Sequence, residues 1–340
     1  MTRSPKQPIL YQDKLGISEK LLRFATPEQV AVYRAEKLKC EKLVEIGAGI
    51  GGQTFAFSKK CKNVLAFESN KESARILIQN LKKLQIKNVE VIIADALSVN
   101  SIDKIKRFQP DIIFCDSERP EQGERTLEKI NPPIKKVLEI FFPITGKIAI
   151  EIPPFTQDIE NLKENFEREF ISLNQQLNRL TLYFNELKNS EVSAISLPSK
   201  EKINSENPKP KINKIYSAKK QKYLYVIDPT IQIANLIPGL AKKFNASILE
   251  LNKPVLLGDE IIKSNFLTGY RIEKVCKTNQ KEILKELKKI GAGKIVLRYN
   301  VKPEDYWKVR NFYENQLEGT KEISLFLNES EDEAILTEKL

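Results

Sequence analysis

The sequence contains no histidine, and this absence removes several kinds of chemistry at once. Histidine is the usual general base near neutral pH, a common zinc ligand and the proton acceptor of Ser/His and Cys/His nucleophilic pairs. Any reaction at this protein must therefore use carboxylates, backbone groups or a reactive cofactor, and we expect no metal site.

Cysteines and long apolar runs are scarce as well. The four cysteines lie at positions 40, 61, 115 and 276, without the spacing of a metal site or a disulfide framework, so we interpret them as buried free thiols. No segment approaches the roughly 18 apolar residues that cross a membrane, and residues 1–14 lack the apolar centre of a signal peptide. These absences predict a cytoplasmic protein that does not enter membranes.

Positive charge, in contrast, is abundant. Lys and Arg total 56 against 45 Asp and Glu, a net charge of +11. Such an excess commonly marks a polyanionic partner, although a lysine-rich surface made for solubility would give the same total. Residues 200–222 alone carry eight lysines and two glutamates. We predict a flexible basic loop over 199–222 whose lysines contact RNA phosphates, among them Lys209, Lys219 and Lys220.

Short apolar runs alternate with amphipathic segments from residue 43 onward. We expect strands over 43–49, 63–69, 89–96, 111–116 and 147–154, and a helix over 71–84 capped by Asn70. Residues 170–176 and 179–185 read as a closing antiparallel pair. Continuous Val/Ile/Leu runs between helices indicate a parallel sheet covered on both faces. The predicted fold class is therefore α/β: a doubly wound, mostly parallel, seven-stranded Rossmann-like sheet over residues 1–198.

The C-terminal third has a different order of predicted helices and strands. Residues 223–269 are predicted to be a connector, and residues 270–340 a small α+β domain of order β-α-β-α-β-β. Arg298 and Lys302 flank Tyr299 at the end of one predicted strand, where cations beside an aromatic ring suit RNA binding. Tyr306 and Trp307 also fit such a stacking surface, but we favour assigning Trp307 to the core of this domain.

A Gly-rich turn, Glu45-Ile-Gly47-Ala-Gly49-Ile-Gly51-Gly52, follows the first strand and precedes a helix. Glycines let a backbone turn sharply and approach a ligand closely. Three of them also match the dinucleotide pattern G-x-G-x-x-G, so the glycines alone do not identify the ligand.

Acidic residues at three successive strand ends discriminate between the ligands. Glu45 precedes the first glycine, where a carboxylate repels a pyrophosphate but can hold a cationic amino acid. Glu68 ends the second strand, where ribose hydroxyls would lie, and Asp95 follows the third, near an adenine amino group. The pattern favours S-adenosylmethionine over a dinucleotide, and a turn without a ligand is the remaining alternative.

Residues 20–198 resemble class I S-adenosylmethionine-dependent methyltransferases. ATPEQVAVYRA (25–35) followed by GAGIGGQT (47–54) is similar to trimethylguanosine-synthase-type enzymes. Almost the whole chain resembles prokaryotic methyltransferases with a C-terminal THUMP-like domain, in RFATPEQVAVYRAEKL, PPIKKVLEI, YLYVIDPTI and LLGDE. This resemblance implies a structured RNA substrate, tRNA or rRNA, and places Thr26 over the cofactor pocket.

The stretch IIFCDSERPEQGER (112–125) contains the expected acceptor site. Asp116 ends an apolar strand at the sheet edge that faces the ligand crevice in doubly wound folds. Exocyclic-amine methyltransferases carry Asp/Asn-Pro-Pro-aromatic here, and the THUMP-like relatives an Asp-Pro-Ala-Arg-type sequence; in this chain Ser117 replaces the proline. We expect Asp116 to orient the methyl acceptor and Arg119 to stack on a base, with Phe155 as a second stacking candidate.

Residues 131–133, Asn-Pro-Pro, look like a displaced copy of that motif, but we interpret them as the first turn of a helix. The leading hypothesis is an RNA methyltransferase with a variant acceptor site. One alternative is an RNA-binding protein whose methyltransferase domain has become weak or inactive. Another is a methyltransferase for proteins or small molecules.

Overall fold

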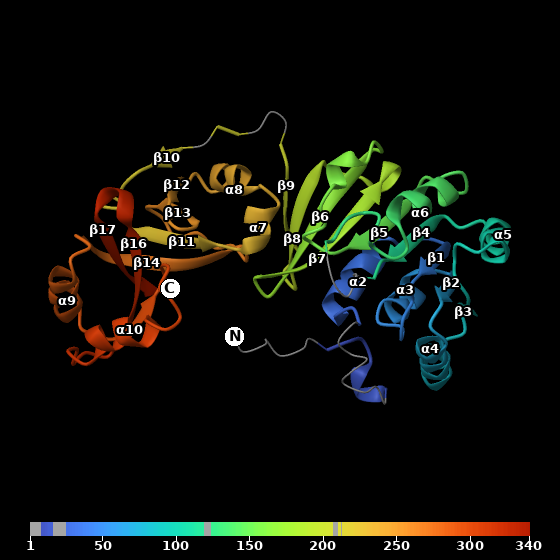
Figure 1. Ribbon diagram of the computed structural model, residues 1–340, viewed down its shortest axis with the longest axis horizontal. Coiled ribbons are helices and arrows are strands. Elements are labelled where there is room, and N and C mark those ends of the chain that lie inside the picture. The colour runs from blue at the N-terminus through green and yellow to red at the C-terminus, as the bar shows by residue number, and fades with distance from the viewer. Residues whose placement is uncertain (1–7, 16–24, 119–123, 207–209, 212) are drawn as a thin grey trace. The chain divides into compact units, whose positions relative to one another are not determined.

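The computed structural model describes residues 8–15, 25–118, 124–206, 210–211 and 213–340 (Figure 1). The chain divides into two compact units, Met1–Lys200 and Glu201–Leu340. Among the described residues, no helix combines the length and apolar character that crossing a membrane requires.

The first unit is built on a mostly parallel sheet. Within this unit the strand order is β3-β2-β1-β4-β5-β7-β6-β8. Strand β7 runs antiparallel to β5 and β6, as predicted for the closing pair, and β8 runs parallel to β6. Strand β8 was not among the seven strands predicted for this unit. The bounds are β1 (Lys42–Ile46), β2 (Asn63–Glu68), β3 (Val89–Ile93), β4 (Ile112–Asp116), β5 (Ile148–Ile152), β6 (Phe166–Leu173), β7 (Gln176–Phe184) and β8 (Val192–Leu197).

Helices connect the parallel strands of this sheet. Asn70 caps α4 as predicted, since its side chain accepts the backbone N–H groups of Glu72 and Ser73. The helices are α2 (Glu28–Lys37), α3 (Thr54–Lys60), α4 (Lys71–Lys83), α5 (Val99–Phe108) and α6 (Ile134–Phe141), and the 3₁₀ turns are η1 (Gln12–Lys14), η2 (Ile159–Asn161) and η3 (Asn185–Leu187).

The strand register places four carboxylates on one face of the sheet. Glu45 lies beside Phe114 on β4, and Asp116 lies beside Glu151 on β5. Side chains alternate along a strand, so Asp116, two residues after Phe114, shares a face with Glu45. The pairing of β1 with β2 adds Glu68 to the same face. Helices α2 and α3 cover this face, because Phe114 shares a core cluster with apolar residues of both.

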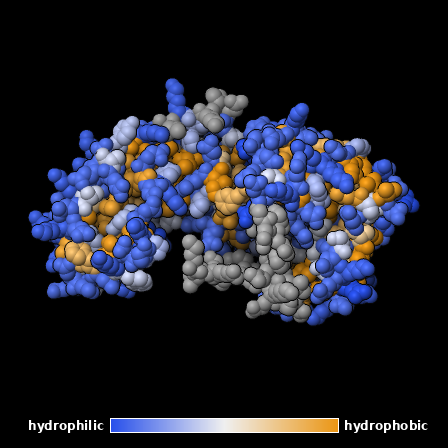
Figure 2. All heavy atoms as spheres, in the orientation of Figure 1, coloured by the Kyte–Doolittle hydropathy of each residue, from blue (hydrophilic) through white to orange (hydrophobic). Residues whose placement is uncertain are grey.

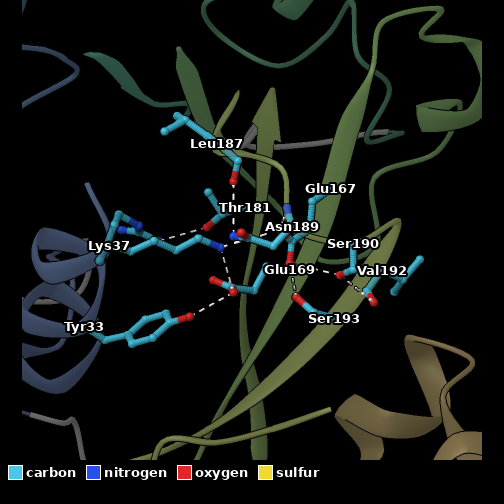
Figure 3. A network of polar contacts seen from close by, with 11 residues as sticks. Tyr33, Lys37, Glu167, Glu169, Thr181, Leu187, Asn189, Ser190, Val192 and Ser193 are labelled. Atoms are coloured by element: carbon cyan, nitrogen blue, oxygen red, sulfur yellow. Dashed lines mark hydrogen bonds and ion pairs between the residues drawn. The ribbon is translucent and has the colours of Figure 1, made fainter. Parts of the chain in front are cut away.

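Buried polar contacts attach α2 to β6 and β7. Figure 3 shows Tyr33 and Lys37 pointing from the helix toward Glu169. The Tyr33 hydroxyl donates to Glu169 Oε2 at 2.8 Å, and Lys37 Nζ donates to the same oxygen at 2.9 Å. Lys37 Nζ also lies 3.8 Å from Glu167 Oε2 and 3.4 Å from the ring centroid of Tyr183. These contacts fix the rotation of α2 on the sheet.

The second unit contains a sheet of order β10-β12-β13-β11-β14-β17-β16-β15. The strands of this sheet are β10 (Lys214–Ile215), β11 (Tyr223–Ile227), β12 (Ser247–Glu250), β13 (Pro254–Gly258), β14 (Leu267–Cys276), β15 (Ala292–Leu297), β16 (Lys321–Asn328) and β17 (Glu333–Lys339). The unit also contains β9 (Glu201–Asn204), which is not part of this sheet. Its helices are α7 (Pro229–Ile233), α8 (Ile237–Lys243), α9 (Gln280–Lys289) and α10 (Tyr306–Glu314), with the 3₁₀ turn η4 (Glu329–Glu331). Figure 2 shows that the surface of each unit is largely hydrophilic, with apolar residues interspersed among the hydrophilic ones.

This sheet differs from the predicted division at residue 270. The long strand β14 pairs with β11 of the predicted connector through its first half and with β17 through the rest. Residues 223–269 therefore belong to the same sheet as residues 270–340. The predicted loop 199–222 also contains β9 and β10, and its Ala218 is fully buried.

Trp307 is not a core residue, in contrast to the prediction. Its side chain is 62% exposed. The face of α10 that packs on the core carries Tyr306, Val309 and Tyr313. Trp307 follows Tyr306 by one residue, about 100° around the helix, and therefore lies outside this apolar stripe.

Tyr33→Phe tests the attachment of α2. The substitution keeps the ring and removes only the hydrogen bond to Glu169, so the free energy of unfolding should fall by about 1.5 kcal/mol, as for a hydrogen bond to a charged acceptor. Urea unfolding followed by circular dichroism measures the change. Tyr216→Phe is the matched control, since Tyr216 is 74% exposed and its loss should cost little. Equal stability of the Tyr33 variant and the wild type would contradict the assignment.

Candidate functional site

The Gly-rich turn after β1 depends on glycine for two different reasons. Gly47, Gly49 and Gly51 all have positive φ, at +80°, +55° and +100°. A Cβ on Gly47 would lie 2.5 Å from the backbone oxygen of Asp116, and one on Gly51 would lie 2.6 Å from Leu77 and Phe55. A Cβ on Gly49 would meet no atom within 4 Å. Gly47 and Gly51 are thus needed for packing, whereas Gly49 borders open space that a ligand could use.

Glu68 connects the end of β2 to this turn. Its Oε2 accepts the Gly49 N–H at 2.7 Å, and its Oε1 accepts the Asn70 N–H at 2.7 Å. The side chain is buried. Each carboxylate oxygen keeps a lone pair after these bonds, so Glu68 can still accept a hydroxyl group.

Glu45 is a fully buried carboxylate without a well-formed hydrogen bond among the described residues. Its pKa is raised to about 8, mainly by burial and also by the charges of Asp116 and Glu68, while Thr54 and Arg34 lower it. A buried polar group of this kind requires a physical explanation. A cationic ligand group would supply the missing partner.

Thr26 lies beside the same turn, and its predicted position over a cofactor stays a prediction. It is buried, and a Cβ on Gly52 would lie 2.9 Å from its backbone nitrogen. Asp95 is placed differently, because it is exposed two residues beyond β3 and its Oδ1 accepts the Leu97 N–H at 2.9 Å. Asp116 and Glu68 both raise the pKa of Glu45, whereas Asp95 is not among the groups that shift it.

Asp116 is the last residue of β4 and is half-buried. Burial raises its pKa to about 7, and the negative charge of Glu151 raises it further, while Arg179 and Arg34 lower it. A carboxylate with this pKa can accept a proton near neutral pH. Arg119, the predicted stacking residue, lies outside the described residues.

A cluster of two arginines around Glu151 was missed by the sequence reasoning. Arg34, fully buried on α2, donates to Glu151 Oε2, to Gln53 Oε1 at 2.9 Å and to Thr181 Oγ1 at 3.3 Å. Arg179 Nε forms an ion pair with Glu151 Oε1 at 2.5 Å. One signal was available, because Glu151 stands inside the apolar strand KIAIEI and Arg34 inside the buried stripe of α2.

The loops beyond β4 and β5 are tied together by backbone contacts. The Glu118 N–H donates to the Asn131 oxygen at 2.7 Å, and the Gln157 N–H donates to the Arg125 oxygen at 2.7 Å. Pro133 is the N-cap of α6, so the Asn-Pro-Pro sequence directly precedes the helix rather than forming its first turn. Phe155, beyond β5, is 58% exposed and therefore available for stacking.

The predicted RNA-binding cations differ in their surroundings. Lys219 Nζ lies 3.5 Å from the buried Glu333, which neutralises part of its charge. Lys220, Arg298 and Lys302 are exposed. Lys209 lies outside the described residues. The structure contains no RNA, so these assignments stay predictions.

Comparisons with known proteins point to methyltransferases. A family model described as ribosomal RNA adenine dimethylase matches residues 27–130. A probable cobalt-precorrin-6B C(15)-methyltransferase (decarboxylating) of Methanococcus vannielii is 34% identical over 109 residues, covering 31% of this chain and 57% of that protein. A probable ribosomal RNA small subunit methyltransferase A of Methanosphaera stadtmanae is 42% identical over 67 residues, covering 19% of this chain and 25% of that protein. The chain thus spans less than two thirds of both curated relatives.

The fold extends this likeness to almost the whole chain. A crystal structure titled "putative methyltransferase", from Porphyromonas gingivalis W83, aligns with a TM-score of 0.76 at 17% identity and covers 95% of this chain and 82% of that one. At this identity the likeness concerns the fold alone. Residues 27–130, which the family model matches, contain the Gly-rich turn, the carboxylates Glu45 and Glu68, and Asp116. The N-terminal unit is therefore similar in sequence to methyltransferases over residues 27–130, the part of the chain that carries the Gly-rich turn and the carboxylates at the strand ends.

Proposed function

We propose that the protein methylates a structured RNA, tRNA or rRNA, with S-adenosylmethionine as the methyl donor. The observation that carries this proposal is the position of Asp116. Its backbone oxygen abuts Gly47 of the Gly-rich turn, and its side chain shares a sheet face with Glu45. Donor-binding groups and an acid able to orient an acceptor thus meet at one edge of the sheet.

The residues at this edge fit S-adenosylmethionine. When bound, this cofactor supplies an electrophilic methyl group on a positively charged sulfur. Glu45 is a buried carboxyl group without a hydrogen-bond partner among the described residues, and a cationic ligand group beside it would favour its charged form. Gly49 leaves room for close approach, and Glu68 can accept ribose hydroxyls. Thr26 beside the turn and Asp95 beyond β3 complete the proposed binding set.

Asp116 orients the acceptor in this proposal. Its carboxylate accepts a hydrogen bond from the N–H of an amine on the base, which aligns the nitrogen lone pair for in-line attack. With a pKa near 7, the same carboxylate can take the proton that the amine loses. Phe155 provides an exposed aromatic ring beyond the neighbouring strand, in place of the aromatic residue that is missing after Asp116.

Charge and exposed aromatic rings support RNA as the substrate. The chain carries a net charge of +11. In the second unit, which we propose to be a THUMP-like RNA-binding domain, Arg298 and Lys302 are exposed cations. Trp307 is exposed too, and the Arg310 guanidinium lies 5.3 Å from its ring centroid. Such rings stack on unpaired bases. The matches to ribosomal RNA methyltransferases point the same way.

Asp116→Asn tests the proposed function directly. With labelled S-adenosylmethionine and total RNA, the wild type should label the RNA. The variant should lose about 100-fold in rate, a typical contribution of an acid–base group, while cofactor affinity stays unchanged. Asp103→Asn on the exposed face of α5 is the control and should retain full activity. Label in proteins or small molecules instead of RNA would contradict the proposal.

Gly49→Ala tests the cofactor site. The added methyl group would enter the open space beside the turn, so calorimetry should show at least about tenfold weaker binding of S-adenosylmethionine, equal to a loss of about 1.4 kcal/mol. Gly291→Ala is a matched control, because Gly291 also has positive φ, +75°, and open space within 4 Å. Both variants should show the same backbone strain, but only the first should lose cofactor affinity. Wild-type affinity in the Gly49 variant would place the cofactor elsewhere.

Glu45→Gln tests the buried carboxylate through pH. Folded Glu45 keeps its proton up to about pH 8, against an ordinary pKa of 4.5, so unfolding releases a proton between these values. The free energy of unfolding of the wild type should therefore fall as pH rises, by up to about 1.4 kcal/mol per pH unit from this group. Urea titrations at pH 5, 6.5 and 8 should show that the free energy of unfolding of the glutamine variant rises relative to that of the wild type as pH increases. Glu139→Gln, on the exposed face of α6, should parallel the wild type. A constant difference for the Glu45 variant would refute the raised pKa.

A further inference from the structure

The two arginines of the Glu151 cluster are not equivalent. Arg34 is fully buried, with its guanidinium 4.8 Å from the ring centroid of Phe114, so it cannot reach a ligand. The Arg179 side chain is 16% exposed. Its Nε faces Glu151, its Nη1 donates to the Asn178 oxygen at 3.2 Å, and its Nη2 has no partner among the residues that the structure describes.

Arg179 lies on the same face and at the same edge as Asp116. Thr181 pairs with Glu151 across β7 and β5, and Glu151 pairs with Asp116 across β5 and β4. Arg179 is two residues from Thr181 and therefore projects from the same face. Because β7 runs antiparallel to β5, Arg179 falls just beyond the carboxyl end of β5.

The charge of the cluster is not balanced internally. Two guanidinium groups share the single carboxylate of Glu151, one on each oxygen. Arginine stays charged at any ordinary pH, so the cluster keeps an excess positive charge. This charge acts on Asp116, whose pKa both arginines lower. A substrate that carries its own negative charge would complete the arrangement.

We infer that Arg179 binds a backbone phosphate at the methyl-accepting nucleotide, and that Glu151 is the positioning residue that holds its guanidinium. This inference rests on the proposed RNA substrate. One edge of the guanidinium is anchored on Glu151, which leaves Nη2 to donate to a phosphate oxygen. Arg34 holds the second oxygen of Glu151 and so keeps that carboxylate from turning away.

The test measures RNA binding as a function of salt. Each phosphate contact with single-stranded RNA contributes about 0.7 to the slope of log Kobs against log salt concentration. For a labelled single-stranded RNA of mixed sequence, Arg179→Met should lower this slope by about 0.7 and raise the KM for RNA, while calorimetry shows unchanged affinity for S-adenosylmethionine. Arg179→Lys keeps the charge and should retain the slope. Glu151→Gln should retain the slope, because the charge of Arg179 is still present. It should lower kcat/KM for RNA, because glutamine does not hold the Arg179 guanidinium in position.

Arg168→Met is the matched control, since Arg168 is exposed on the neighbouring strand β6 and lies away from the cluster. Arg179→Gln serves as a second neutral variant if the methionine variant does not fold. An unchanged slope and KM in the neutral variants would overturn the inference and leave the proposed function standing. Failure of the wild type to bind or methylate RNA, while it binds S-adenosylmethionine, would overturn both.

Discussion

The buried ion pair between Arg34 and Glu151 is the constraint on which the site depends. A fully buried guanidinium is tolerated only where its charge and its N–H groups are satisfied, and removing one partner of such a pair costs about 3–5 kcal/mol. Arg34 Nη1 and Nη2 bond to Glu151 on β5, Thr181 on β7 and Gln53 beside the Gly-rich turn, whereas its Nε has no hydrogen-bond partner among the described residues. One side chain thereby sets the spacing between the helix, the Gly-rich turn and strands β5 and β7.

The same helix is held at further points along its length. Tyr33 and Lys37 bond to Glu169, so α2 presents a row of polar side chains to strands that lie beyond the parallel part of the sheet. Thr26 precedes this helix by two residues and lies against Gly52. The position of the Thr-Pro-Glu segment over the turn is thus a consequence of charge pairing farther along α2.

Crowding of acids on one face provides groups that titrate near neutral pH in a sequence without histidine. Burial and mutual repulsion raise the pKa values of Glu45 and Asp116 to about 8 and 7. Carboxylates then titrate in the range where histidine usually works. Strand β4 ends on Asp116 without the usual prolines and aromatic residue, and the structure provides an exposed ring from the loop after β5 instead, at Phe155.

Local sequence by itself determined the sheet class, the Gly-rich turn, the cap at Asn70 and the acids at strand ends, because periodicity, glycine and capping residues act over a few positions. Tertiary structure alone decided which charges meet. The Arg34–Glu151 pair joins residues 117 positions apart, and no local pattern encodes such a contact. Trp307 was misplaced for a similar reason, since its exposure depends on how α10 is rotated against its sheet. Residues 223–269 form one sheet with residues 270–340 because β14 is long enough to pair with both β11 and β17. Which strands pair with each other cannot be read from the sequence of a single strand.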